Sequence, residues 1–204
     1  MRRIHLVITC GILALGRSAA AQSCDAGALR AELEQEGVRV DHWNLAWRIV
    51  YTAAAAGQFG VAASGVADHD NTRSLWVGGG EAAISALGFW LAPLRIEVPV
   101  ATGDACTDRA ALRAAAERAA ADERNAFWTN HIGGLLINLA GSAILVETAS
   151  WKTAALSFAT GYPVGLLTTY TMPRASWGRV REPAWTVSVV AGDRRHALVV
   201  AGAF

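Results

Sequence analysis

Four long segments with almost no charged side chains constrain the fold of this chain more than any other feature. Residues 49–67, 125–146 and 153–173 contain no Asp, Glu, Lys or Arg, and residues 74–94 contain only Glu81. Each segment is close to the roughly 20 residues that an α-helix needs to cross the hydrocarbon core of a bilayer. Because short joints follow the first and third segments, the pattern predicts an all-α membrane protein with four transmembrane helices arranged as two helical hairpins.

The tryptophan positions support the same prediction. A composition of 53% hydrophobic and 17% charged residues excludes a disordered chain.

A soluble helical bundle with buried apolar helices remains an alternative to the membrane protein. It would scatter its tryptophans, whereas seven of the eight here lie at or near segment ends, as in an interfacial aromatic belt: Trp43, Trp47, Trp76, Trp90, Trp128, Trp151 and Trp177.

The end of the chain has a different pattern. Residues 185–191 and 196–204 are rich in β-formers and flank the turn signal Gly192-Asp193, so we expect a C-terminal β-hairpin. The terminal Phe204 also fits the closing strand of a small outer-membrane β-barrel, which is the alternative fold. Stretches such as 135–139 lack the alternation of apolar and polar residues that barrel strands need.

The N-terminus has the features of a secretory signal peptide. Arg2 and Arg3 precede an apolar run at residues 4–16, and small residues follow up to Ala21. This order predicts cleavage after Ala21. An uncleaved anchor, or a lipoprotein attached at Cys24, fits the pattern less well.

Export determines how the cysteines are interpreted. Cys10 leaves with the signal peptide, so the mature chain keeps Cys24 and Cys106 in a compartment where disulfides persist. We expect the two to pair. Closing a loop of about 80 residues stabilises a fold by roughly 4 kcal/mol in the entropic model.

These features divide the chain into six parts. We expect the first extracytoplasmic helix to start at Asp25 and stop at Gly37, and a second one, capped by Thr107, to continue into the third span. The parts are a cleaved signal peptide (1–21), a short extracytoplasmic helix (22–41), a first transmembrane hairpin (42–97), an extracytoplasmic loop and helix (98–124), a second transmembrane hairpin (125–173) and a C-terminal tail with the β-hairpin (174–204).

Few residues inside the expected spans are able to support chemistry. Glu81 is the strongest candidate, because an ionisable group in a span is costly and usually faces a partner or a cavity. Arg48 enters the same hairpin at a depth about 10 Å away, which predicts either an ion pair with Glu81 or a separate polar role. His131 and Asn138 lie two helical turns apart on one face and suit interhelical hydrogen bonds or a polar path with Glu81.

No catalytic or nucleotide-binding motif accompanies these residues. The chain has no phosphate-binding loop, zinc-protease motif, serine-hydrolase motif or paired CxxC, so we expect no cofactor and no metal, and catalysis is not indicated. A net charge of +1 also disfavours a nucleic-acid partner.

The sequence therefore predicts an integral membrane protein of the bacterial cell envelope with a structural or interaction role. Its expected partners are membrane lipids, a second copy of itself or other envelope proteins. The alternatives are a small carrier or channel subunit that uses Glu81, His131 and Asn138, and a lipid-modifying intramembrane enzyme. The signal peptide and the arginine distribution give opposite topologies, so inner and outer membrane both stay open.

Overall fold

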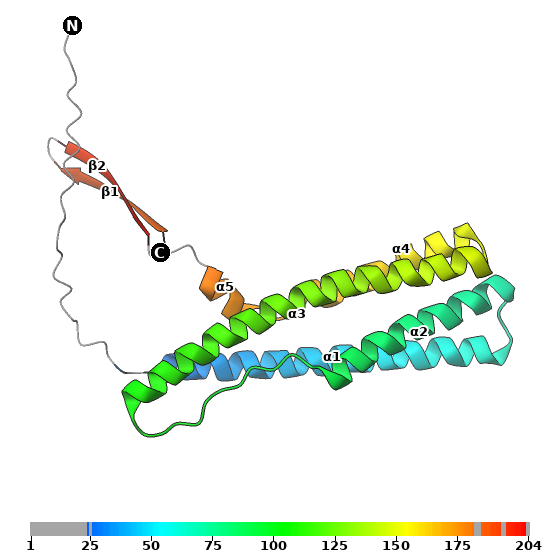
Figure 1. The fold of residues 1–204 in the computed structure, drawn as a ribbon, viewed down its shortest axis with the longest axis horizontal. Coiled ribbons are helices and arrows are strands. Elements are labelled where there is room, and N and C mark those ends of the chain that lie inside the picture. The colour runs from blue at the N-terminus through cyan, green and yellow to red at the C-terminus, as the bar shows by residue number, and fades with distance from the viewer. Residues whose placement is uncertain (1–23, 25, 182–184, 193–194, 203–204) are drawn as a thin grey trace, which may run out of the picture.

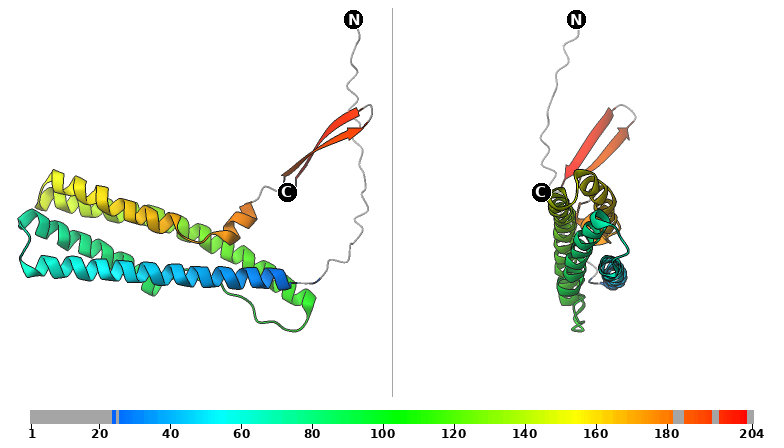
Figure 2. Two further views of the ribbon diagram at one scale, coloured as in Figure 1. Left: turned by 180° about the vertical axis from the view of Figure 1, so that it is seen from behind. Right: turned by 90° about the vertical axis from the view of Figure 1, so that its right-hand side faces the viewer.

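The computed structural model describes residues 24, 26–181, 185–192 and 195–202. The expected signal peptide and Cys10 lie outside these residues. Four long helices form an elongated body in which α1 runs antiparallel to α2 and α3 runs antiparallel to α4, and a short fifth helix follows (Figures 1 and 2). Their bounds are α1 Gly27–Ser64, α2 His69–Leu91, α3 Ala105–Thr148, α4 Trp151–Tyr170 and α5 Ala175–Arg181.

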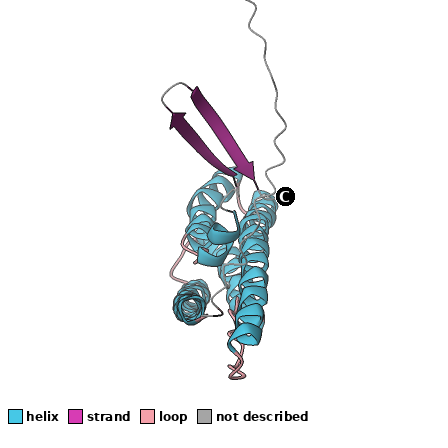
Figure 3. Ribbon diagram, turned by 90° about the vertical axis from the view of Figure 1, so that its left-hand side faces the viewer, coloured by secondary structure: helices cyan, strands magenta, loops and turns pink. Residues whose placement is uncertain are grey.

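The described residues up to Arg181 form helices and loops without a strand. Two strands follow, β1 Trp185–Gly192 and β2 Arg195–Gly202, and they pair antiparallel with Trp185 opposite Gly202. Figure 3 shows this pair in magenta against the cyan helices. A small outer-membrane β-barrel is therefore wrong, because the segments that it would need as strands are helical.

Local turn and cap residues produce the two helical hairpins. Gly65 adopts a left-handed conformation with φ of 71°, which ends α1, and the Asp68 side chain accepts a hydrogen bond from the Asn71 N–H to start α2. Ser150 caps α4 in the same way through the Thr153 N–H. Both hairpins fall where the short joints between segments predicted them.

The prediction of four transmembrane helices is wrong. Among the helices that the structure describes, α3 alone is long and apolar enough to cross a membrane. Lack of charge was an insufficient criterion, because Ala, Gly, Ser and Thr fill much of the other three segments and contribute little hydropathy. The expected stop at Gly37 is also wrong, since α1 continues through it as one helix of 38 residues.

Large apolar side chains lie mainly on the outside of the four-helix body. Small and polar residues fill the inside, including Ala55, Ala82, Asn138 and Thr168. Only 17% of the most apolar stretch of α3 is buried, whereas a core helix of a soluble protein is mostly buried. The exposed apolar residues along α3 are Trp128, Ile132, Leu136, Leu139, Ile144 and Val146.

The charged end of the body has a conventional core. Leu33 of α1 and Leu112 of α3 are fully buried, and Ile96 and Val98 of the segment between α2 and α3 pack against them. A disulfide joins Cys24 to Cys106 across a separation of 82 residues, as the sequence predicted. Asp104 caps α3, because its side chain accepts a hydrogen bond from the Thr107 N–H, so the expected cap at Thr107 is wrong.

Helix α5, which the sequence did not predict, is held at its N-terminus by two buried glutamates. The Glu123 carboxylate accepts hydrogen bonds from the N–H groups of Ser176 (3.4 Å) and Trp177 (2.6 Å), and Glu36 accepts one from the Ala175 N–H (3.1 Å). Burial raises the pKa of Glu123 and the nearby Glu36 adds to the rise, while the two backbone hydrogen bonds oppose it. These carboxylates tie α5 to α1 and α3.

Candidate functional site

A cavity of about 360 Å³ lies between the four long helices, in the uncharged part of the body. Every helix contributes polar groups to its lining, among them Gln58 of α1, Glu81 of α2, Asn138 of α3 and Thr160 of α4. Small residues such as Gly78, Gly134, Gly161 and Gly165 make up much of the remaining wall. The cavity therefore joins a carboxylate, amides and hydroxyls inside an otherwise apolar region.

Glu81 reaches across the cavity toward α3 and α4. A Cβ atom added to Gly141 of α3 would overlap its Oε1 atom, and one added to Gly161 of α4 would lie 3.7 Å from its Oε2 atom. Gly141 thus provides the space that the carboxylate occupies, and Gly161 lies at ordinary contact distance from it. No described residue forms a hydrogen bond or an ion pair with this carboxylate, so Glu81 faces the cavity without a cationic partner.

Asn138 directs a second oxygen to the same place. Its side chain is 8% exposed, and its Nδ2 atom donates to the Gly134 carbonyl at 2.8 Å. Its buried Oδ1 atom has no hydrogen-bond partner, and a Cβ atom on Gly161 would overlap it. The Glu81 carboxylate and the Asn138 amide oxygen therefore converge over Gly161. Both are acceptors, so the arrangement lacks a donor or a cation.

Arg48 does not supply that cation. Its Nη2 atom donates to the Phe89 carbonyl at 3.1 Å, and its guanidinium lies 4.3 Å from the centroid of the Trp90 ring. The ion pair between Arg48 and Glu81 that the sequence suggested is absent from the described residues. Cation–π stacking at the end of α2 takes its place.

His131 also lies away from Glu81. Its ring stacks parallel to Phe127 at 6.1 Å and meets Tyr170 edge to face at 6.1 Å, and its Nδ1 atom is buried without a hydrogen-bond partner. It does not line the cavity that contains Glu81 and Asn138. The structure thus joins two of the four predicted polar residues and separates the other two.

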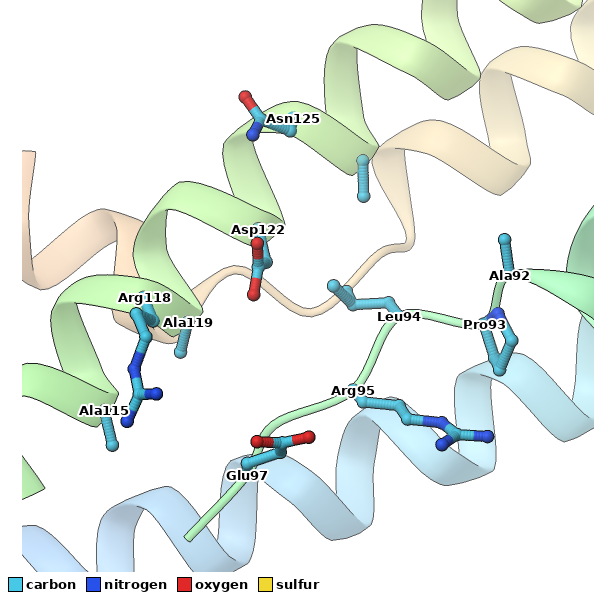
Figure 4. A pocket seen from close by; sticks show the side chains of 11 residues that line it. Ala92, Pro93, Leu94, Arg95, Glu97, Ala115, Arg118, Ala119, Asp122 and Asn125 are labelled. Carbon is cyan, nitrogen blue, oxygen red and sulfur yellow. The ribbon is translucent and has the colours of Figure 1, made fainter. Parts of the chain in front are cut away.

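Another cavity, of about 400 Å³, lies at the charged end, between α3 and the segment that follows α2 (Figure 4). Figure 4 shows Arg118 and Asp122 projecting from α3, and Arg95 and Glu97 on the facing segment. Its two arginines and two carboxylates balance in charge. No spacing in the chain indicates that these four residues meet.

No known family model, curated protein or solved structure matches this chain. Within the part of the chain that the structure describes, no three His, Cys, Asp or Glu side chains group as a metal site. The sequence did not indicate Gln58 or Gly141 as site residues, because a glycine that makes room for a carboxylate looks like any other small packing residue.

The geometry around Glu81 suits binding better than covalent catalysis. Two oxygen acceptors at one point in an apolar surrounding favour a proton, a small cation or an ammonium group, because an unpaired charge there is costly. The nearby Tyr51 hydroxyl is already hydrogen-bonded to Thr168 Oγ1 at 2.7 Å.

Proposed function

We propose that this chain is an integral membrane protein of the bacterial cell envelope that binds a small cation in the cavity around Glu81 and Asn138 and acts as a carrier or channel subunit. The observation that carries this proposal is the convergence of the unpaired Glu81 carboxylate and the unpartnered Asn138 Oδ1 atom over Gly161. A site with two acceptors and no donor is complementary to a cation. His131 has no part in it.

Membrane residence rests on the outer surface of the body. α3 is long enough and apolar enough to cross a bilayer, and its large side chains point outward. A disulfide fits an exported chain, and residues 1–21 have the signal-peptide pattern. Envelope fractionation with N-terminal sequencing tests this part. Mature protein should begin at Gln22 in a membrane fraction, and an intact N-terminus would contradict the cleaved signal.

A structural or interaction role is the second candidate. The exposed apolar side chains favour it, because a second copy or another envelope protein would cover them as well as lipid does. The lipid-modifying enzyme has no such support. The two remaining roles differ in one respect, since transport alone requires the Glu81 carboxylate itself.

Ion flux through reconstituted vesicles distinguishes them. The full chain is placed in phosphatidylcholine vesicles, and the uptake of sodium ions, of methylammonium and of protons is measured separately. We expect the wild type to raise uptake of one of them above that of empty vesicles, and Glu81→Gln to abolish the rise. Glu147→Gln, the same change at an exposed position at the end of α3, is the matched control and should retain it.

One outcome would contradict transport, and another would contradict the assignment of the site to Glu81. If none of the three crosses faster with protein than without it, the carrier proposal is wrong and the interaction role is preferred. If Glu81→Gln transports as well as the wild type, the site has been assigned to the wrong residue.

A further inference from the structure

A groove separate from the Glu81 cavity lies where α3 changes from charged to apolar. Its volume is about 610 Å³. It lies between the middle of α3 and the start of α5, where Arg174 and Trp177 are located. Aromatic and basic side chains dominate its lining, which consists of Glu117, Ala120, Ala121, Arg124, Phe127, Trp128, Arg174 and Trp177. We call these eight residues the Arg124 groove.

Both arginines of the Arg124 groove occupy the same level of the protein. Arg124 is the last charged residue before the uncharged segment 125–146, and Arg174 is the first after the uncharged segment 153–173. Because α3 and α4 run antiparallel, these two boundaries lie at the same end of the hairpin. In a membrane this level is the interface, where basic side chains meet lipid phosphates and tryptophan rings are favoured.

The two guanidinium groups are available for an anion. Neither forms a salt bridge with a described residue, and the Arg174 guanidinium lies 5.0 Å from the centroid of the Phe127 ring, which fixes its position. Two buried carboxylates near Arg174 already have partners: Glu123 accepts hydrogen bonds from α5, and Glu36 accepts one from the Ala175 N–H and pairs with Arg39 at 3.5 Å. Glu117 lies two helical turns from Arg124, about 10 Å further from the apolar segment. The apolar end of the groove is thus positively charged.

An apolar path leads away from that end. Trp128, Ile132 and Leu136 follow one another at intervals of four residues on one face of α3, and all three are at least half exposed, at 51%, 51% and 59%. An acyl chain lying along this face would leave its phosphate beside Arg124. The groove and the face together match the shape and polarity of a phospholipid.

We propose that the Arg124 groove binds one anionic phospholipid, with its phosphate between Arg124 and Arg174 and an acyl chain along Trp128, Ile132 and Leu136. The inference shares membrane residence with the proposed function and is independent of the Glu81 site. Guanidinium groups bind phosphate oxygens in a planar, bidentate geometry. The two uncompensated positive charges favour a lipid with a net negative headgroup over a zwitterionic lipid, whose ammonium group would lie close to the arginines.

Thermal unfolding of the purified full chain in a nonionic detergent tests the proposal, followed by circular dichroism at 222 nm while lipid is added. Phosphatidylglycerol should raise the unfolding midpoint in a saturable way, and phosphatidylcholine should not. In Arg124→Gln/Arg174→Gln the half-saturating concentration of phosphatidylglycerol should rise by about thirtyfold, since each basic contact near an anionic surface contributes a factor of about five.

Control variants separate lipid binding from general effects of charge. Arg113→Gln/Arg118→Gln removes two arginines from the same helix outside the groove and should respond like the wild type. Arg124→Lys/Arg174→Lys keeps the charges and should restore most of the response, even if the glutamine pair lowers the midpoint itself. Glu81→Gln should leave the response unchanged, so this test and the flux test fail independently.

Three results would overturn the proposal. An equal shift with phosphatidylcholine would show that the groove does not recognise the anion. An equal shift with inorganic phosphate or glycerol 3-phosphate would show that the acyl chain is not bound. An unchanged half-saturating concentration in the glutamine pair would place the lipid elsewhere.

Discussion

Replacing Gly141 by alanine tests the position of the Glu81 carboxylate directly. An added Cβ atom would overlap Glu81 Oε1 and would lie 2.9 Å from Val77 Cγ1. Either the carboxylate leaves the cavity or α2 moves away from α3. Overpacking of this kind typically costs about 1 to 3 kcal/mol, partly offset by the higher helix propensity of alanine, about 1 kcal/mol.

A double-mutant cycle with Glu81→Ala isolates the contact. Once the carboxylate is removed, the new methyl group meets only Val77, whose end can rotate, so Gly141→Ala should become nearly neutral. We therefore expect a coupling free energy of about 1 to 2 kcal/mol between the two positions. The free energy of unfolding is measured by titrating the protein in mixed micelles with sodium dodecyl sulfate and following circular dichroism.

The matched control is Gly133→Ala on the same helix. A Cβ atom there meets nothing within 4 Å, so this change should stabilise the protein by up to about 1 kcal/mol. Additive effects of Gly141→Ala and Glu81→Ala, or a stabilisation by Gly141→Ala equal to that by Gly133→Ala, would refute the placement of the carboxylate against α3.

Two further predictions concern the charged end. The variant Cys24→Ser/Cys106→Ser should lose about 4 kcal/mol of stability, the loop-closure entropy for a separation of 82 residues, measured in the same titration; a loss below about 1 kcal/mol would show that the unfolded chain is already compact. Because burial raises the pKa of Glu123 above the ordinary glutamate value of 4.5, protonation of Glu123 favours the folded state. That contribution is complete below pH 4.5 and is lost as pH rises through the folded pKa. In Glu123→Gln, stability measured across this range should vary less with pH, and parallel profiles would contradict the assignment.

The sequence predicted the order of the helices well, because the determinants are local. Four segments with almost no charge and two short joints, with Asp68 and Ser150 at helix starts, suffice for two hairpins. The disulfide followed from the two cysteines that remain once residues 1–21 are interpreted as a signal peptide. The sequence also predicted that the helix before the third segment continues into that segment. α3 is indeed one helix, because no residue between 105 and 148 breaks a helix strongly enough to end it.

Other features depend on contacts between distant residues, and the sequence does not show them. Helix α5 starts where Glu36 and Glu123 present their carboxylates, 139 and 53 residues away from the N–H groups that they accept from. Gly37 did not stop α1, because Gly adopts helical angles readily and costs only about 1 kcal/mol in a helix interior. Tertiary packing of the flanking Glu36 and Val40 outweighs that cost.

Arg48 shows why counting depth along a helix was not enough to predict the site. The estimate of about 10 Å to Glu81 placed the two residues within reach, but it left out the direction of the side chain. Arg48 bonds to the Phe89 carbonyl and stacks on Trp90, two turns beyond Glu81, where a guanidinium can approach water. Glu81 is thereby left without a partner. Because no buried arginine pairs with Glu81, Glu81→Gln leaves no opposite charge unpaired, and the fold should survive a change that removes the proposed cation site.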